Sequence, residues 1–317
     1  MSVLLETVQL KKYFDTAAGK LHAVDNINLK IKQGETLGVV GESGCGKSTL
    51  GRTILRLTDP TSGQILFNGT DICALKRTEL KKARTDMQII FQDPYSSLDP
   101  RMSVRDIIKE PLVIYKAYAS SAEQERAVLS LMDKVGLARR FANSYPHELD
   151  GGRRQRIGVA RALALNPKFI VCDEPVSALD VSIQAQILNL LMDLQDEMNL
   201  TYLFITHDLS VVRHISNNIM VMYLGQCIEM APAEEIFEGP LHPYTKALLS
   251  AIPKPDLSCR SDENQIIYGE VTSPINPKPG CRFASRCKHC TCACTEHDFA
   301  LREQSPNHFV ACRLYES

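Results

Sequence analysis

The chain lacks several features that would assign it at once to a broad class of protein. Its longest apolar runs, at residues 202–205 and 219–224, fall far short of the roughly 20 residues that a membrane-spanning helix needs. The N-terminus has no basic segment followed by an apolar one, which is the pattern of a secretory signal. We therefore expect no membrane span and a chain that remains in the cytoplasm.

An excess of charge of one sign is also missing. The formal net charge is −1 with 23% charged residues, so neither a basic surface for nucleic acid nor an acidic tail is indicated. We found no internal repeat and no low-complexity tract. The length of 317 residues allows one large or two smaller domains with a substantial core.

Cysteine is sparse over most of the chain and dense near its end. Seven of the eleven cysteines fall between Cys259 and Cys312. In a reducing compartment such a cluster indicates a metal site more often than a set of disulfides.

One short segment carries a strong functional motif. Residues 41–49 read Gly-Glu-Ser-Gly-Cys-Gly-Lys-Ser-Thr and fit the pattern GxxxxGK[ST]. An apolar run at 36–40 predicts a buried strand before it, and apolar residues at helical spacing over 50–57 predict a helix after it. In that context backbone N–H groups converge on a triphosphate, Lys47 reaches the terminal phosphates and Ser48 binds Mg²⁺. The residues predicted to bind nucleotide here are Gly41, Glu42, Ser43, Gly44, Cys45, Gly46, Lys47, Ser48 and Thr49.

Polar side chains follow three further apolar runs, at 87–92, 169–174 and 201–206. Strand ends of one parallel sheet meet at a common edge, where ligands bind. Gln92 would then hold Mg²⁺ and its water and sense the terminal phosphate, and Asp173 would hold Mg²⁺ through water.

Two of these strand-end residues have the chemistry to act on water. Glu174 would polarise the attacking water as general base, and His207 would donate to the terminal phosphate and orient that water. An acidic strand cap and a structural histidine are the plainer alternatives for the two residues.

Weaker patterns predict the remaining elements. Runs at 3–10, 23–31 and 64–68 predict a small sheet, and Tyr13 lies in a polar stretch that we expect to be a loop between the first two strands. Tyr13 either stacks on an adenine ring or packs on its own sheet.

The second half of the chain contains longer helical patterns. Residues 104–165 predict an inserted helical stretch, whose clearest periods are 122–135 and 153–165, and residues 182–197 predict an amphipathic helix. A hairpin at 219–230 and a helix at 244–251 follow, before a Pro-, Lys- and Asp-rich linker at 253–263 and the cysteine-rich tail.

Taken in order, these motifs identify a family resemblance. The chain resembles ATP-binding cassette (ABC) ATPases over residues 3 to about 250, through the loop 41–49, Gln92, the pair Asp173 and Glu174, Ser177-Ala-Leu-Asp180 and His207. The resemblance implies an α/β fold of the P-loop NTPase class. Its parts would be a RecA-like parallel-sheet core, an antiparallel β subdomain and an inserted helical subdomain at about 93–165, within a nucleotide-binding domain spanning 1–252. A small cysteine-rich extension at 253–317 would follow.

A narrower resemblance is to the second ATPase subunit of bacterial dipeptide/oligopeptide importers. It rests on Phe-Gln-Asp-Pro-Tyr-Ser-Ser-Leu-Asp-Pro at 91–100, Asp-Glu-Pro-Val-Ser-Ala-Leu-Asp-Val at 173–181 and His-Pro-Tyr-Thr at 242–245. The resemblance implies ATP and Mg²⁺ as cofactors, a sister ATPase subunit in a heterodimer, two membrane permease subunits and, indirectly, an extracytoplasmic solute-binding protein. The chain would lie at the cytoplasmic face of the membrane, with no nucleic acid bound.

The family's LSGGQ signature has a departure in this chain. Leu-Asp-Gly-Gly-Arg occupies 149–153, so Asp150 replaces the serine that, with Gly151 and Gly152, would contact the partner's ATP. One hypothesis is a heterodimer with unequal sites, because a carboxylate repels a nucleotide phosphate. Asp150 is equally suited to cap the helix that starts at Gly151, and Arg153 and Arg154 would neutralise part of its charge.

The tail also matches a pattern of peptide-importer ATPases, through Cys281, Cys287, Cys294 and Cys312. In some relatives this quartet carries a [4Fe-4S] cluster, and four thiolates suit tetrahedral zinc as well. We rank iron-sulfur first, zinc second and a metal-free tail third. Cys290 and Cys292 are additional thiols that would compete for the fourth place.

Three readings of function remain at this point. The first is an importer ATPase for di- or oligopeptides, with nickel or a metal chelate as the alternative cargo. The second is a soluble, non-transport ABC ATPase acting on DNA or ribosomes. The third is a metal-binding or redox module that only happens to bind nucleotide. The near-neutral charge disfavours the second, and the ordered nucleotide motifs disfavour the third.

Overall fold

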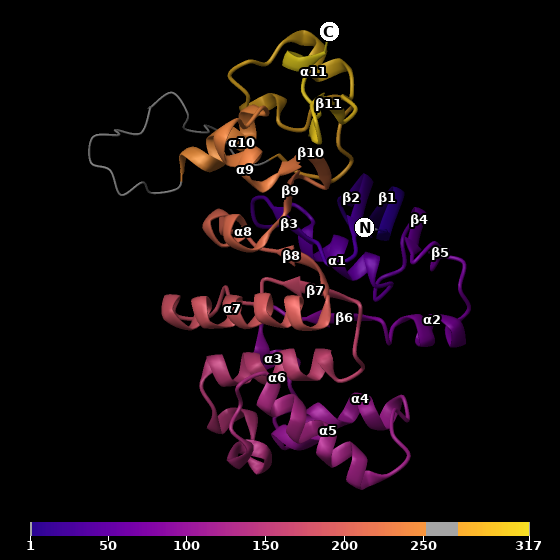
Figure 1. The fold of residues 1–317 in the computed structure, drawn as a ribbon. Coiled ribbons are helices and arrows are strands. Elements are labelled where there is room, and N and C mark those ends of the chain that lie inside the picture. The colour runs from indigo at the N-terminus through magenta and orange to yellow at the C-terminus, as the bar shows by residue number, and fades with distance from the viewer. Residues whose placement is uncertain (1, 252–271, 317) are drawn as a thin grey trace. The chain divides into compact units, whose positions relative to one another are not determined.

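A computed structural model describes residues 2–251 and 272–316, which divide into two compact units (Figure 1). The loop unit comprises Val3–Ile31, Thr36–Ala74 and Phe204–Ser317, and the helical unit consists mainly of Leu75–Leu203. The predicted linker at 253–263, the predicted domain boundary between 252 and 253 and Cys259 lie outside the described residues.

The loop unit contains an antiparallel sheet in the order β2-β1-β4-β5 and a second group of strands in the order β11-β12-β10-β9-β3. Within the second group β3 and β9 are parallel, with Val39 opposite Met220. The strands are β1 (Val3–Thr16), β2 (Gly19–Lys32), β3 (Thr36–Val40), β4 (Ser62–Phe67), β5 (Thr70–Asp71), β9 (Asn218–Tyr223), β10 (Gln226–Pro232), β11 (Arg302–Ser305) and β12 (His308–Val310). The α-helices are α1 (Lys47–Ile54), α8 (Leu209–Ile215), α9 (Ala233–Glu238), α10 (Pro243–Ser250) and α11 (Cys292–Glu296).

The loop predicted around Tyr13 is wrong. Tyr13 lies within β1, a strand of 14 residues that continues well past the predicted end at residue 10. The register of β1 against β4 shifts between Val8 and Lys11, and Gln9 has a φ of 47°. This irregularity interrupts the alternation of apolar and polar residues, which is why the pattern hides the second half of the strand.

The cysteine-rich tail is continuous with the loop unit. Its strand β12 pairs antiparallel with β10, where Glu229 lies opposite Val310 and Met230 opposite Phe309. His308 is buried on this strand, and its Nε2 lies 2.8 Å from the Glu229 carboxylate, which is fully buried. The backbone N–H of Asn276 also donates a hydrogen bond to the carbonyl of Lys20 in β2. The tail is therefore anchored at several points.

The helical unit contains three packed helices and the strands β6 and β7, and Asp173 is the last residue of β7, directly before Glu174. α4, α5 and α6 pack on one another (Figure 1), through buried residues such as Ile108, Met132 and Ile157. Strands β6 and β7 are parallel. The elements are α2 (Arg77–Ala83), β6 (Met87–Ile90), α3 (Pro94–Ser97), α4 (Val104–Ile114), α5 (Ser121–Lys134), α6 (Gly151–Leu163), β7 (Phe169–Asp173) and α7 (Val181–Met198).

Buried parallel strands account for the continuous apolar runs seen in the sequence. Every residue of β3, β7 and β8 (Thr201–Ile205) is buried. Strands covered on both faces have no polar face to alternate with, so they read as unbroken apolar segments. The predicted α/β class, with a parallel core, an antiparallel subdomain and an inserted helical stretch, is confirmed. Among the helices of residues 2–251 and 272–316, none is long and apolar enough to cross a bilayer.

Candidate nucleotide site

The glycine loop lies between β3 and α1, as its motif predicts. Gly41 has a φ of 152° and Gly46 a φ of 106°, a region that side-chain-bearing residues rarely adopt. A Cβ on Gly41 would lie 2.2 Å from the carbonyl oxygen of Met222, and one on Gly46 would lie 2.0 Å from that of Ala23. Both positions therefore require glycine for conformation and for space.

The start of α1 is built to receive an anion. Gly46 is its N-cap and supplies no side chain to the first turn, which contains Ser48 and Thr49. Backbone N–H groups at a helix N-terminus, with the helix dipole, favour negative charge. Lys47 is 5% exposed, and its ammonium donates to the carbonyls of Gly41 at 2.7 Å and Glu42 at 3.0 Å. The loop thus places the Lys47 ammonium beside a helix N-terminus that has no side-chain cap.

Cys45 is a small buried side chain in this loop. It is 3% exposed, and burial raises the pKa of its thiol, which favours the neutral form. Ser43 and Gly44 are exposed at the tip of the loop.

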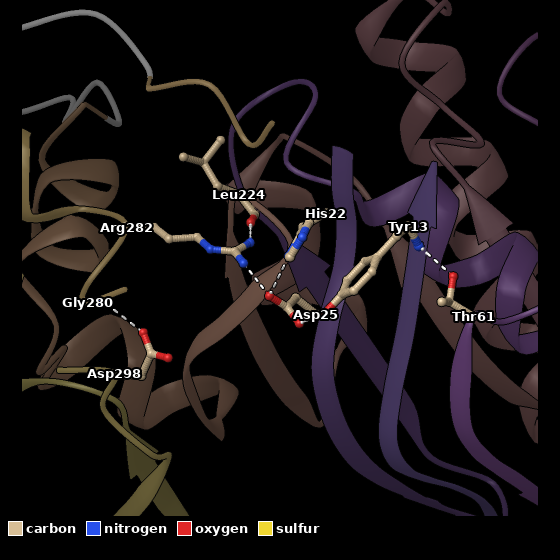
Figure 2. A network of polar contacts seen from close by, with 8 residues as sticks. All are labelled: Tyr13, His22, Asp25, Thr61, Leu224, Gly280, Arg282 and Asp298. Carbon is tan, nitrogen blue, oxygen red and sulfur yellow. Dashed lines mark hydrogen bonds and ion pairs between the residues drawn. The ribbon is translucent and has the colours of Figure 1, made fainter. Parts of the chain in front are cut away.

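Tyr13 is held at two points (Figure 2). Its hydroxyl donates to the Asp25 carboxylate at 2.5 Å, and its ring stacks on His22 with centroids 3.8 Å apart and planes 17° apart. Burial raises the pKa of Tyr13, as does the hydrogen bond to Asp25, so the phenol remains a neutral donor. Burial alone would raise the pKa of Asp25, but hydrogen bonds from Tyr13 and His22 outweigh it and lower that pKa. The result is a fixed aromatic surface on β1.

Within the helical unit, two predicted strand-end residues meet. Nε2 of Gln92 donates to Oε2 of Glu174 at 2.9 Å, although the two residues are 82 positions apart. Glu174 has a φ of 48°, a strained value for this residue type, and Ser177 donates to its carbonyl at 3.2 Å. Asp173, one residue earlier, is 1% exposed at the end of β7. The structure therefore gathers the amide and the carboxylates that the motif predicts.

The signature segment starts helix α6. Asp150 is the N-cap, and its carboxylate accepts from the backbone N–H of Arg153 at 2.8 Å and from the Arg153 guanidinium at 2.7 Å. Arg154 points to a different partner, the carbonyl of Pro146, at 2.7 Å. Gly151 and Gly152 form the first turn, where a Cβ on Gly152 would lie 2.7 Å from Ile183. Asp150 thus serves as a helix cap, and Arg153 balances its charge.

His207 lies in the loop unit, two residues after β8, and is exposed. The predicted site residues are therefore divided between the two units. The loop 41–49, Tyr13 and His207 belong to the loop unit, and Gln92, Asp150, Asp173 and Glu174 belong to the helical unit.

The sequence reasoning missed several residues that contact this site. Asp25 and His22 contact Tyr13, and Arg286 contacts Glu42. Arg282 contacts Asp25 and so reaches Tyr13 only through that carboxylate. No local motif contains them, because they lie up to 257 positions apart along the chain.

The predicted metal site in the tail is not supported. Cys281, Cys287, Cys294 and Cys312 line one small cavity of about 20 Å³, and Cys290 and Cys292 are exposed. Nevertheless, in the part of the chain that the structure describes, no group of three or more His, Cys, Asp or Glu side chains is placed to hold a metal ion.

Comparisons with known protein families match two segments of the chain. Residues 24–177 match a family described as "ABC transporter", and residues 228–294 match one described as "Oligopeptide/dipeptide transporter, C-terminal region". The second match spans the end of the fold and much of the cysteine-rich tail.

Comparisons with curated proteins cover almost the whole chain. It is 51% identical to the oligopeptide transport ATP-binding protein AppF of Bacillus subtilis, over 98% of this chain and 97% of that protein. It is 50% identical to the oligopeptide transport ATP-binding protein OppF of Salmonella typhimurium, over 98% and 96%.

Solved structures resemble the fold as well. The ATP-binding cassette MJ0796, solved as a dimer in a post-hydrolysis state with ADP and phosphate, matches with a TM-score of 0.67 and 32% identity, over 72% of this chain and 98% of that one. CbiO1 of Clostridium perfringens, part of an ABC transporter complex, matches with a TM-score of 0.67 and 29% identity, over 75% and 92%.

Proposed function

This chain belongs to the ATP-binding subunits of ABC transporters, and on that premise we propose that it hydrolyses ATP to drive import of di- or oligopeptides. Relatives about half identical over nearly their full length are named oligopeptide transport ATP-binding proteins. The observation that carries the proposal is the loop 41–49, with Lys47 placed at an open helix start. Nickel or a metal chelate is the alternative cargo.

The chemistry follows from the residues in the two units. In the loop unit, the glycine loop and Lys47 would bind the phosphates of ATP, and Ser48 would be a ligand of Mg²⁺. In the helical unit, Gln92 and Asp173 would be ligands of Mg²⁺. Glu174 accepts a proton from water as the water oxygen attacks the γ-phosphorus, and the bond to the bridging oxygen breaks to release ADP. Gln92 orients that carboxylate through the hydrogen bond described above. His207 donates to the terminal phosphate.

The assembly follows from the same premise. A sister ATPase subunit would place its signature against the ATP on this loop, and Asp150, Gly151 and Gly152 would face the sister's ATP. Two permease subunits would carry the peptide, delivered by a solute-binding protein, while this chain lies peripherally on the cytoplasmic face of the membrane. A further part of the proposal is that the ATP site facing Asp150 hydrolyses ATP more slowly than the other, because the carboxylate repels the phosphates of the nucleotide.

Glu174→Gln in the assembled transporter tests the central claim. We expect ATP turnover and uptake of labelled peptide to fall by more than about 100-fold while ATP still binds, because the general base alone is lost. The matched control is Glu234→Gln, an exposed carboxylate at the start of α9, which should leave turnover unchanged. Normal turnover in Glu174→Gln would refute the role. Uptake of nickel in place of peptide would select the other cargo.

A second, smaller proposal concerns the cysteine quartet, although its side chains are not placed to hold a metal ion in the part of the chain that the structure describes. Four thiols from segments up to 31 positions apart line one cavity, and they would carry a [4Fe-4S] cluster or, failing that, zinc. Iron and sulfide with absorbance near about 400 nm in anaerobically purified protein would support the cluster. Colourless protein with one zinc would support the alternative, and metal-free protein would reject both.

A further inference from the structure

Two arginines of the cysteine-rich tail make ion pairs with the nucleotide-binding part of the loop unit. Arg282 directly follows Cys281, and Arg286 directly precedes Cys287. Their side chains are only 6% and 8% exposed. Arginine this deeply covered is held where its guanidinium has defined partners.

Arg282 supports the aromatic surface (Figure 2). Its guanidinium donates to the Asp25 carboxylate and to the carbonyl of Leu224. Asp25 is the group that accepts the Tyr13 hydroxyl, and its other oxygen lies 3.2 Å from Nδ1 of His22. One carboxylate therefore joins the tail to both stacked rings, and its orientation depends on Arg282.

Arg286 supports the phosphate loop in a similar way. Two of its nitrogens donate to the two oxygens of Glu42, at 3.0 and 3.2 Å, in a bidentate pair. It also donates to the Tyr223 hydroxyl at 3.2 Å. The backbone of Glu42 donates to the Tyr244 hydroxyl at 2.9 Å, and its carbonyl accepts from Lys47 at 3.0 Å. Glu42 is thereby fixed by its side chain and by both ends of its backbone.

We propose that the tail is a working part of the ATP site, in which the ring of Tyr13 stacks on the adenine, Arg282 positions that ring and Arg286 positions the phosphate loop. The inference rests on the proposed ATP binding, and it assigns positioning roles, since each arginine acts through an acidic residue. The physical reason is that removing one partner of a covered ion pair leaves the other charge without compensation, and the carboxylate must then move toward solvent.

Two ligands separate the two roles in the full-length chain. Mg-ATP carries the base, and magnesium tripolyphosphate carries only the phosphates; calorimetry gives an affinity for each. We expect Arg282→Gln to weaken ATP about 5- to 10-fold, the scale of one stacking contact, and to leave tripolyphosphate unchanged. We expect Arg286→Gln to weaken both ligands by a similar factor.

Three further variants keep the test decisive. Arg302→Gln is the matched control, since this tail arginine is 55% exposed and lies 3.6 Å from Glu316, and it should change neither affinity. Arg282→Lys restores a charge beside Asp25 and should recover part of the ATP affinity. Tyr13→Phe removes only the hydroxyl that Asp25 holds and should reproduce the ATP-selective loss even if Arg282→Gln fails to fold.

The outcomes distinguish this inference from its premise. A wild-type chain that binds neither ligand would refute the ATP site itself. Normal wild-type binding, with equal losses of both ligands in Arg282→Gln and Tyr13→Phe or no loss in either, would overturn the positioning of the base. An Arg286→Gln variant that binds tripolyphosphate as tightly as wild type would overturn the positioning of the loop.

Discussion

Three helix starts in this chain use different caps, and the caps differ in whether a side chain occupies the backbone N–H groups of the first turn. At α1 the cap is Gly46, which brings no side chain. At α6 it is Asp150, whose carboxylate accepts from the backbone of Arg153, and at α10 it is His242, whose Nδ1 accepts from the N–H of Tyr244 at 3.0 Å. A side-chain cap satisfies donors that a ligand would otherwise use. Only the uncapped start of the three carries the phosphate motif.

The largest expected effect concerns the uncapped start. Gly46→Ala should weaken ATP binding more than about 100-fold, because its Cβ would lie 2.0 Å from a backbone oxygen of the neighbouring strand. Gly69→Ala is the matched control, since Gly69 lies outside the phosphate loop, a Cβ there meets nothing within 4 Å, and its φ of 76° should cost only about 1 kcal/mol. Calorimetric titration of both variants with Mg-ATP gives the comparison. Equal affinities would show that loop geometry does not control binding.

The imidazole cap at α10 predicts a pH effect on stability. His242 is 1% exposed, and burial lowers its pKa from 6.5 to about 4. The unfolded chain therefore binds a proton near pH 6.5 that the folded chain excludes until about pH 4. Acidification across this window should favour unfolding by up to about 3 kcal/mol.

A single variant isolates that contribution. His242→Asn retains a neutral side-chain acceptor for the cap but cannot titrate between pH 4 and pH 6.5. Denaturant unfolding at several pH values should show a shallower loss of stability on acidification in the variant than in wild type. Parallel curves for the two proteins would contradict the assignment.

The carboxylate cap at α6 should give the smallest effect of the three. Asp150→Ala removes the cap and should cost about 1 kcal/mol of stability, whereas Asp150→Ser retains a cap and should unfold like wild type. If the carboxylate also repels the partner's ATP, Asp150→Ser should raise turnover of the assembled complex about threefold, since Arg153 and solvent screen most of the charge. Unchanged or slower turnover in Asp150→Ser would show that Asp150 caps α6 but does not slow hydrolysis of the partner's ATP.

Local parts of the site could be predicted from the sequence because their geometry is local. The strand, glycine loop and helix over 36–54 follow from adjacent residues. The approach of Gln92 and Glu174 follows from two strand ends in one parallel pair. Asp150 is the N-cap of α6, and its residue type alone favours that position, which is why capping is one of the two alternatives that the sequence offers for it.

The rest depends on contacts that no sequence pattern encodes. Asp25 and Arg282 pair across 257 positions, and each alone reads as an ordinary surface charge. The length of β1 was missed because an irregularity at Gln9 breaks its alternation. Tertiary packing determines the Asp25–Arg282 pair and the length of β1, so only the folded structure reveals these two features.

The pairing of β12 with β10 has a practical consequence for anyone who shortens this protein. Ending the chain before the tail would remove β12, which pairs with Glu229 and Met230 of β10. Their backbone N–H and C=O groups would then lie at an unpaired sheet edge. Such edges recruit other chains by the same ladder of hydrogen bonds. Aggregation of a truncated preparation would then result from the exposed edge of β10, and it would not show that the remaining fold is unstable.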